Sequence, residues 1–148
     1  MDSIASRNEN KITTTNPSIN MKIDSHHHFW KYDPHTYSWM NDKMDILKVD
    51  YQPEDLIKEI SAVGIDGVVS VQADQSLRET DDLLEYAKVN DFILGVVGWL
   101  PLADENVRDL MDKYSDNSLL KGIRHVVQDE PDDDFILGEH FNRGISLL

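Results

Sequence analysis

Short apolar runs alternate with helical patterns along most of the chain, and this alternation constrains the fold more than any other feature. Strands separated by helices are typical of parallel β-α-β units, in which each helix crosses from one strand to the next. The apolar runs are rich in Val and Ile and do not alternate strictly with polar residues, as expected for strands covered on both faces. The runs that we expect to form strands are residues 21–28, 68–71, 93–100 and 119–127.

Signals at the helix ends support the same order of elements. Pro53 suits the first turn of a helix, and Gly64 is placed to end it. Ser76 and Glu79 have the spacing of a capping box, which predicts the start of a second helix. Asp104 can cap a third helix. We therefore expect an α/β protein with the order β-α-β-α-β-α-β, followed by an acidic loop and the start of another helix.

Composition excludes several kinds of partner and site. The 148 residues include 28 acidic and 14 basic ones, so the net charge of −14 argues against nucleic acid or an anionic membrane as a partner. No apolar stretch approaches the roughly 20 residues that span a bilayer, and no secretory signal is evident, which favours a cytoplasmic protein. Because the chain has no Cys, a metal site would need His and carboxylate ligands.

Three consecutive histidines follow Asp24 and Ser25 at the end of the first expected strand. In a strand, His26 and His28 share one face with Asp24, and His27 takes the other. Two imidazoles with this spacing can lean onto one divalent ion, for which zinc is the first choice. A catalytic zinc normally has three protein ligands, and the pair supplies only two. Histidines merely exposed at a strand end remain the alternative.

Polar residues also stand at the ends of the other three expected strands. Gln72 ends the second and Trp99 the third, whereas Arg124, His125 and Gln128 end the fourth. Parity places Arg124 and Gln128 on one face of that strand, and Arg124 can bind a carboxylate or polarise a carbonyl. An ion pair with the acidic loop is the alternative for Arg124, and capping of a turn is the alternative for Gln72. His125 is better explained as a packed histidine.

Aromatic residues gather in the loop that follows the histidines. Five of the chain's 12 aromatic side chains lie there, namely Phe29, Trp30, Tyr32, Tyr37 and Trp39. Such a loop can cover the mouth of an active site and stack on a substrate, which makes Trp30 a candidate substrate-binding residue. A loop that folds back and buries its own rings explains the same composition.

Taken together, these strand ends resemble the amidohydrolase-related, metal-dependent hydrolases with a TIM-barrel fold. The resemblance is strongest to their sugar-lactonase branch, which includes fuconolactonase-like and rhamnonolactonase-like enzymes. It covers residues 21–148 and leaves residues 1–20, which are rich in Ser, Thr and Asn, as an expected disordered tail. The motifs that carry it, in order, are Ile23-Asp24-Ser25-His26-His27-His28-Phe29-Trp30, Val69-Ser70-Val71-Gln72-Ala73, Gly95-Val96-Val97-Gly98-Trp99, and residues 122–131.

The resemblance implies roles for the strand-end residues. It makes His26 and His28 the metal ligands on the first strand, although some members of the branch dispense with the metal and use such a pair for substrate. Arg124 is the implied catalytic residue that orients the substrate. The implied lining of the substrate pocket is Gln72, Trp99 and Gln128. The implied partner is a small-molecule lactone, with a homo-oligomer left open.

The chain departs from the family in one respect. The family takes further histidine ligands from the fifth and sixth strands and a catalytic aspartate from the eighth, whereas only about four strands are expected here. A complete barrel needs about 250 residues. We therefore interpret residues 21–148 as the first half of a (β/α)8 barrel, with little or no activity expected from it alone. A decarboxylase of the same superfamily and a non-catalytic fragment that pairs with a partner are the alternatives.

Overall fold

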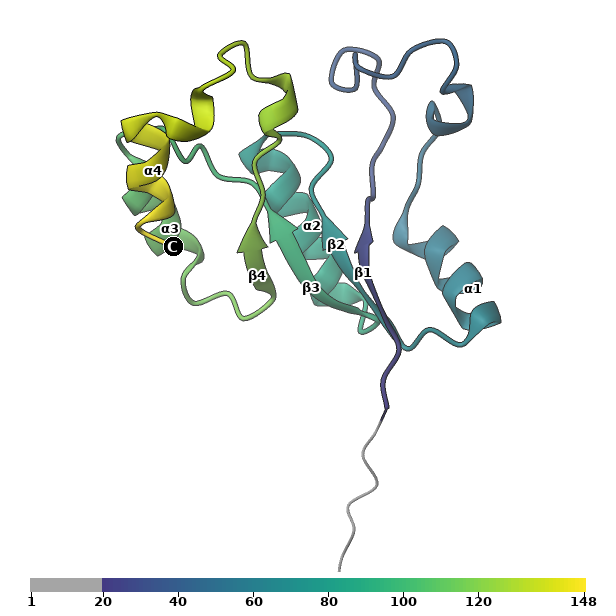
Figure 1. Cartoon of the computed structure of the whole chain (residues 1–148). Helices are drawn as coiled ribbons and strands as arrows, with labels where there is room; N and C mark the ends of the chain where they lie inside the picture. Colours follow the sequence, from purple (N-terminus) through teal and green to yellow (C-terminus); the bar gives the residue numbers. More distant parts are fainter. Residues whose placement is uncertain (1–19) are drawn as a thin grey trace, which may run out of the picture.

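The computed structural model describes residues 20–148, which contain one sheet of four parallel strands in the order β1-β2-β3-β4. All four strands point the same way in Figure 1, so their carboxyl ends share one edge of the sheet. The parallel α/β fold expected from the sequence is confirmed, and the predicted N-terminal tail lies outside the described residues apart from Asn20. The strands are β1 (Ile23–His27), β2 (Gly67–Val71), β3 (Ile93–Gly98) and β4 (Leu120–Ile123).

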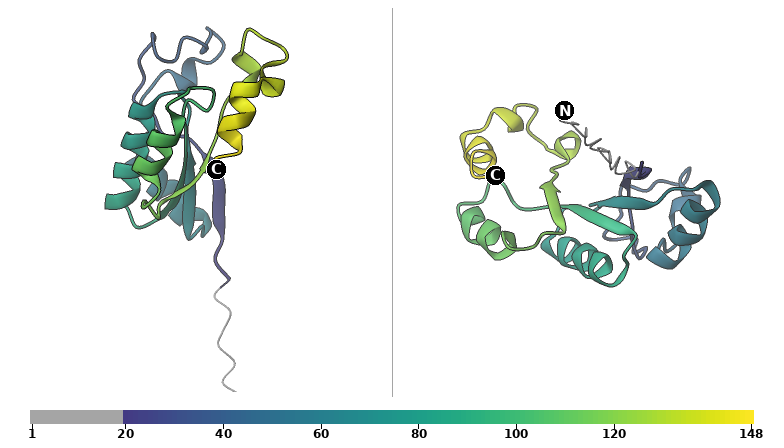
Figure 2. Two further views of the ribbon diagram at one scale, coloured as in Figure 1. Left: turned by 90° about the vertical axis from the view of Figure 1, so that its left-hand side faces the viewer. Right: turned by 90° about the horizontal axis from the view of Figure 1, so that it is seen from below.

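Helices connect the strands and cover one side of the sheet. Figure 2 shows α2 and α3 on one side, with α1 beside β1 and α4 beyond β4. No helix within residues 20–148 is long and apolar enough to cross a membrane. The helices are α1 (Pro53–Val63), α2 (Leu77–Val89), α3 (Val107–Tyr114) and α4 (Glu139–Ile145), and the 3-10 turns are η1 (Asp45–Leu47), η2 (Val127–Asp129) and η3 (Phe135–Leu137).

The core lies between the sheet and helices α2 and α3. Val68 and Val96 contribute strand side chains that are fully buried, and Leu83 and Val107 meet them from the helices. Gly98 allows α2 to approach β3 closely, because a Cβ there would lie 2.7 Å from a methyl group of Thr80. This packing fixes β2 and β3 and so determines where their carboxyl ends lie.

Three of the predicted helix signals are confirmed, and one is wrong. Pro53 is the first residue of α1. Gly64 ends α1 with a φ of 70°, the left-handed conformation that glycine adopts easily. Ser76 caps α2, since its Oγ accepts a hydrogen bond from Glu79 N at 3.2 Å. Asp104 does not cap α3: the helix begins at Val107 after Asn106, and Asp104 Oδ1 accepts from Asn106 N in the preceding turn.

The last two strands end earlier than the sequence predicts. At the end of β3, Trp99 N donates to the Thr80 hydroxyl at 2.8 Å instead of to a neighbouring strand. Beyond β4, Val126 N donates to Gln75 Oε1 at 2.7 Å and the chain turns into η2. The prediction that Arg124 and Gln128 share a strand face is therefore wrong, because β4 stops before both of them.

Candidate active site at the carboxyl ends of the strands

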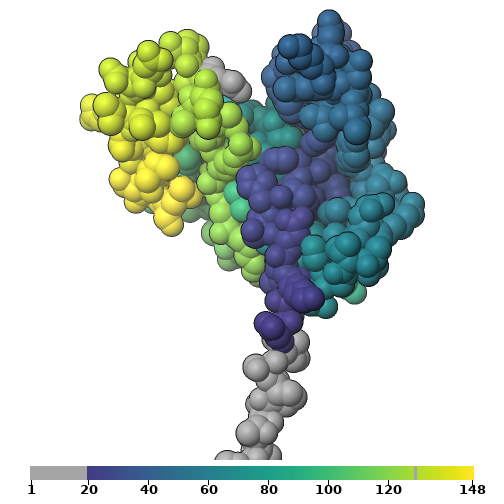
Figure 3. Space-filling view, turned by 45° about the vertical axis from the view of Figure 1, so that its right-hand side comes forward, coloured from purple at the N-terminus to yellow at the C-terminus, as the bar shows by residue number. Residues whose placement is uncertain are grey.

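The surface is hollowed above the carboxyl end of β1. In Figure 3 a notch separates the loop that follows β1 from the segment that follows β4, with β1 exposed between them. The carboxyl ends of parallel strands are where α/β proteins place their ligand sites. The notch is therefore the part of the surface on which the predicted site residues can converge.

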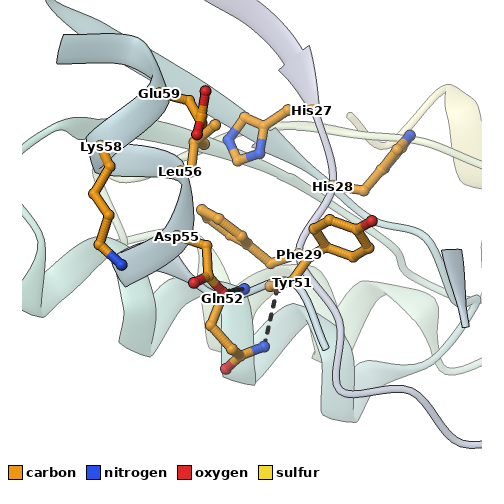
Figure 4. A pocket seen from close by; sticks show the side chains of 9 residues that line it. All are labelled: His27, His28, Phe29, Tyr51, Gln52, Asp55, Leu56, Lys58 and Glu59. Carbon is orange, nitrogen blue, oxygen red and sulfur yellow. Dashed lines mark hydrogen bonds between the residues drawn. The ribbon is translucent and has the colours of Figure 1, made fainter. Parts of the chain in front are cut away.

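His26, on β1, and His28, the first residue after β1, direct their rings to the same side, as predicted. Their ring centroids are 5.0 Å apart, in an edge-to-face arrangement. His27 takes the other face, where its Nε2 lies 3.1 Å from the hydroxyl of buried Ser70 and its ring meets Phe29. Figure 4 shows the same division, with His27 beside α1 and His28 directed away from it.

A main-chain carbonyl orients the ring of His28. Its Nδ1 lies 2.9 Å from the carbonyl oxygen of Val71, which can only accept, so Nδ1 carries the proton and Nε2 is left bare. Burial lowers the pKa of His28, and the charges of His26 and Arg124 lower it further. His28 is therefore held as a neutral imidazole with one lone pair available.

Arg124 and Gln72 join the ends of β4 and β2 by two reciprocal hydrogen bonds. Arg124 Nη1 donates to Gln72 O at 3.0 Å, and Gln72 Nε2 donates to Arg124 O at 3.3 Å. Gln72 is fully buried, and its Oε1 has no hydrogen-bond partner among the described residues. One guanidinium N–H thus binds a strand end beside the histidine pair, and the other N–H groups can bind a ligand.

Trp99 is fixed at both its main chain and its side chain. Thr80 Oγ1 donates to Trp99 O at 2.9 Å and accepts from its N–H. The indole Nε1 donates to His125 Nδ1 at 3.3 Å, and His125 Nε2 lies 2.6 Å from Glu130 Oε1. His125 also stacks on Phe135, so the packed histidine expected from the sequence is what the structure contains.

The two remaining predicted residues have no contact with the histidine pair among those of the described residues. Gln128 is exposed in η2. Trp30 is tied into its own loop, because its indole N–H donates to the carbonyls of Leu47 and Val49. Within that loop Tyr37 is buried, and Trp39 is 47% exposed. The aromatic loop therefore folds back on itself in large part, as the alternative reading held.

Glu79 is a buried acid whose environment the sequence did not reveal. Its Oε2 accepts from the N–H groups of Ala73 and Asp74, which follow the end of β2, at 2.9 and 2.7 Å. Burial raises the pKa of Glu79 to about 7. The Ser-x-x-Glu spacing identified Glu79 as part of a capping box, but that pattern predicts that its carboxylate accepts from the N–H of Ser76. The N–H groups of Ala73 and Asp74 precede the cap residue Ser76, so they fall outside the four-residue pattern of a capping box.

The histidine pair fits part of a metal site. Two imidazoles on one face, one with its Nδ1 donating to a carbonyl and its Nε2 bare, match the way that proteins present histidine ligands. Within residues 20–148 there is no group of three or more His, Cys, Asp or Glu side chains able to hold an ion. Any metal here would therefore need a further ligand beyond these two.

The fold and the position of the site define the class. Four β-α units in sequential order, with polar side chains at the carboxyl edge, are the first four units of a TIM-barrel protein whose site lies at the strand ends. Comparison of sequences then identifies the family. The family profile described as Amidohydrolase matches residues 23–138, which is most of the chain. The chain belongs to the amidohydrolase family.

Individual relatives agree with this assignment. The chain is 35% identical over 129 residues to an L-fucono-1,5-lactonase from Burkholderia multivorans, covering 86% of this chain and 43% of that protein. It is 30% identical over 118 residues to an L-fucono-1,5-lactonase from Burkholderia ambifaria, covering 80% and 41%. The crystal structure of a B. multivorans amidohydrolase with bound zinc superposes with a TM-score of 0.78 at 35% identity, covering 85% of this chain and 44% of that one. The chain thus spans less than half the length of the relatives it matches.

Proposed function

We propose that this chain supplies the N-terminal part of an active site that hydrolyses a sugar lactone. The observation that carries the proposal is the histidine pair. The rings of His26 and His28 lie together at the carboxyl end of β1, the Val71 carbonyl orients His28, and the charge of Arg124 acts on the same ring. Two relatives at 30% and 35% identity are L-fucono-1,5-lactonases, which supports a lactone of this type as the substrate.

The proposed roles follow from the chemistry of each side chain. His26 and His28 hold a divalent ion, zinc being the first choice since a 35% identical amidohydrolase contains it. Such an ion, when bound, polarises a carbonyl and lowers the pKa of water. Arg124 orients the lactone through the guanidinium N–H groups not directed at Gln72. Gln72 belongs to the proposed pocket as the fully buried residue whose Nε2 holds the main chain of Arg124 at the pocket edge.

The other predicted residues complete the proposal. Trp99 and Gln128 belong to the lining of the pocket, with Gln128 contributing from the exposed turn η2. Trp30 contributes its ring surface, because its N–H donates within its own loop. The proposed partner is a small-molecule lactone, and a cytoplasmic location remains part of the proposal. No observation favours the decarboxylase alternative.

A chimera tests this function. Residues 23–138 of this chain replace the matching segment of the B. multivorans lactonase, which supplies the remaining part of the barrel. We expect the chimera to hydrolyse L-fucono-1,5-lactone or a related sugar lactone, measured by acid release in weakly buffered solution. Loss of Arg124 (R124A) should lower kcat/KM by about a hundredfold or more, since a charge-assisted contact to the reacting group is removed.

The matched control lies inside the histidine run. Substituting His27 (H27Q) removes an imidazole that faces α1, so it should leave turnover within a few-fold of the parent chimera. Substituting His26 or His28 (H26A, H28A) should abolish turnover. A folded chimera that hydrolyses no sugar lactone, or that releases CO₂ from aromatic acids instead, would contradict the proposal.

A further inference from the structure

A short relay of hydrogen bonds holds the indole of Trp99. Trp99 Nε1 lies 3.3 Å from His125 Nδ1, and His125 Nε2 lies 2.6 Å from Glu130 Oε1. An indole N–H can only donate, so His125 Nδ1 accepts and the imidazole proton lies on Nε2. That proton is donated to the Glu130 carboxylate. The relay therefore has one defined direction, from Trp99 through His125 to Glu130.

Aromatic packing keeps the middle member of the relay in place. The His125 side chain is only 8% exposed. Its ring stacks on Phe135, with centroids 4.9 Å apart and planes 18° apart, and meets Phe141 edge-on at 5.5 Å. Phe135 comes from η3 and Phe141 from α4. The imidazole therefore cannot turn away from Trp99 without breaking contacts to both of these elements.

The main chain of Trp99 is fixed independently of this relay. Thr80, which is fully buried in α2, both donates to the carbonyl of Trp99 and accepts from its N–H. Trp99 is thus held from two sides, by α2 at its backbone and by the segment after β4 at its ring. A side chain that only fills space would not need the hydrogen bond to its ring from the segment after β4.

We infer that His125 and Glu130 are positioning residues that set the orientation of the Trp99 indole at the substrate pocket. The inference rests on the proposed function, in which Trp99 lines that pocket. Because His125 uses the indole N–H, Trp99 offers a substrate its ring surface and not a hydrogen-bond donor. The C–H groups of a sugar ring suit such an aromatic surface, so a sugar lactone is the matching class of substrate.

The test follows the indole signal of Trp99 in the full 148-residue chain. The three tryptophan indole N–H resonances are recorded by ¹H–¹⁵N correlation, and the spectrum of W99F identifies the one that belongs to Trp99. In H125F, which keeps a ring between the two phenylalanines but removes both nitrogens, this N–H should exchange with solvent about tenfold faster. The exposed His35 provides the matched control, H35F, which should leave the signal unchanged.

Glu130 supplies a conservative rescue. The variant E130A removes the acceptor for His125 Nε2 and should shift the Trp99 signal, whereas E130Q keeps an acceptor oxygen and should retain it. If H125F does not fold, the comparison of E130A with E130Q decides the question. A Trp99 signal that is unchanged in H125F, or that moves equally in E130A and E130Q, would overturn the inference.

Kinetics of the lactonase chimera give a separate readout. There, H125F and E130A should raise KM several-fold while kcat stays within about twofold, because a misplaced ring weakens binding without touching the reacting atoms. A fall in kcat alone would overturn the positioning role. A chimera that folds but is inactive would refute the proposed function, while the indole signals would still decide whether the relay holds Trp99.

Discussion

Glu79 carries two backbone hydrogen bonds on one oxygen, and its other oxygen has no partner among the described residues. Burial raises its pKa from 4.5 to about 7, because desolvation outweighs the stabilising effect of the bonds from Ala73 and Asp74. Over this pH range the folded chain keeps a proton that the unfolded chain has lost. The contribution of Glu79 to stability therefore falls as the pH rises from about 4.5 to about 7.

Replacing this carboxyl group by an amide (E79Q) should remove that dependence. The free energy of unfolding of E79Q minus that of the parent should rise between pH 5 and pH 8, by up to about 3 kcal/mol, since 2.5 pKa units correspond to that energy. Urea denaturation at several pH values measures it. The exposed residue Glu85 in the same helix gives the control, E85Q, for which the difference should stay flat. A flat difference for E79Q would refute the assignment.

Sequence reasoning at the residue scale succeeded where the partner is local. The face shared by His26 and His28 follows from the alternation of side chains along a strand, and the cap at Ser76 follows from a four-residue pattern. The partners of Glu79 and Trp99 could not be predicted in this way. The partners of Glu79 lie in the loop just before α2, whose conformation no residue pattern specifies, and the partner of Trp99 lies on α2, 19 residues earlier in the chain.

Among the elements, α4 depends on one close approach to the chain that follows β3. Gly144 is buried, and a Cβ at this position would overlap the carbonyl oxygen of Leu102. The overlapping atoms belong to the main chain of Leu102, so no change of side-chain rotamer relieves the overlap. Phe141 on the same helix contacts His125, which accepts the hydrogen bond from the Trp99 indole. The position of α4 therefore also affects the packing around the Trp99 ring.

Adding a methyl group at this contact (G144A) should therefore push α4 away from Leu102. We expect a loss of about 1–3 kcal/mol in the free energy of unfolding, as for other overpacked positions. The exposed residue His140 in the same helix provides the control, H140A, which should change stability by less than about 0.5 kcal/mol. Chemical denaturation compares the two, and equal stability of G144A and the parent would disprove the contact.

The order of the elements was predictable, but their ends were not. Apolar runs and helix signals located four strands and the helices between them, because both depend on residues close together in the sequence. The ends of β3 and β4 depend on Thr80 and Gln75, whose side chains take main-chain N–H groups that a longer strand would have used. Both residues lie far from these strand ends along the chain.

At the scale of the whole molecule, β1 and β4 are the two edges of the described sheet. Beside β1 lies a pocket of about 380 Å³ between the strand and α1, lined in part by Phe29, Leu56 and His27 (Figure 4). In a closed eight-stranded barrel such edges are paired with further strands. The described residues therefore present one side of a site whose other side a closed barrel would provide.

Because the described residues present only one side of the site, we can predict the affinity of the chain for zinc. Within residues 20–148, His26 and His28 belong to no group of three or more candidate ligands, so we expect weak zinc binding by the chain alone. The affinity should be at least about a hundredfold lower than in the lactonase chimera, where the added strands can complete the site. Competition with a zinc-binding dye measures both affinities. In the chimera, H26A and H28A should weaken binding strongly and H27Q should not. Equal affinity of chain and chimera would show that the ion binds elsewhere.

The bond from His28 to the carbonyl of Val71 has a consequence for how such a site withstands mutation. The acceptor belongs to the main chain, so no replacement of the Val71 side chain deletes it. Residue 71 can therefore change during evolution without altering the orientation of the His28 ring, provided that β1 and β2 keep their pairing. A slip of one position would turn His27 inward and both of its neighbours outward.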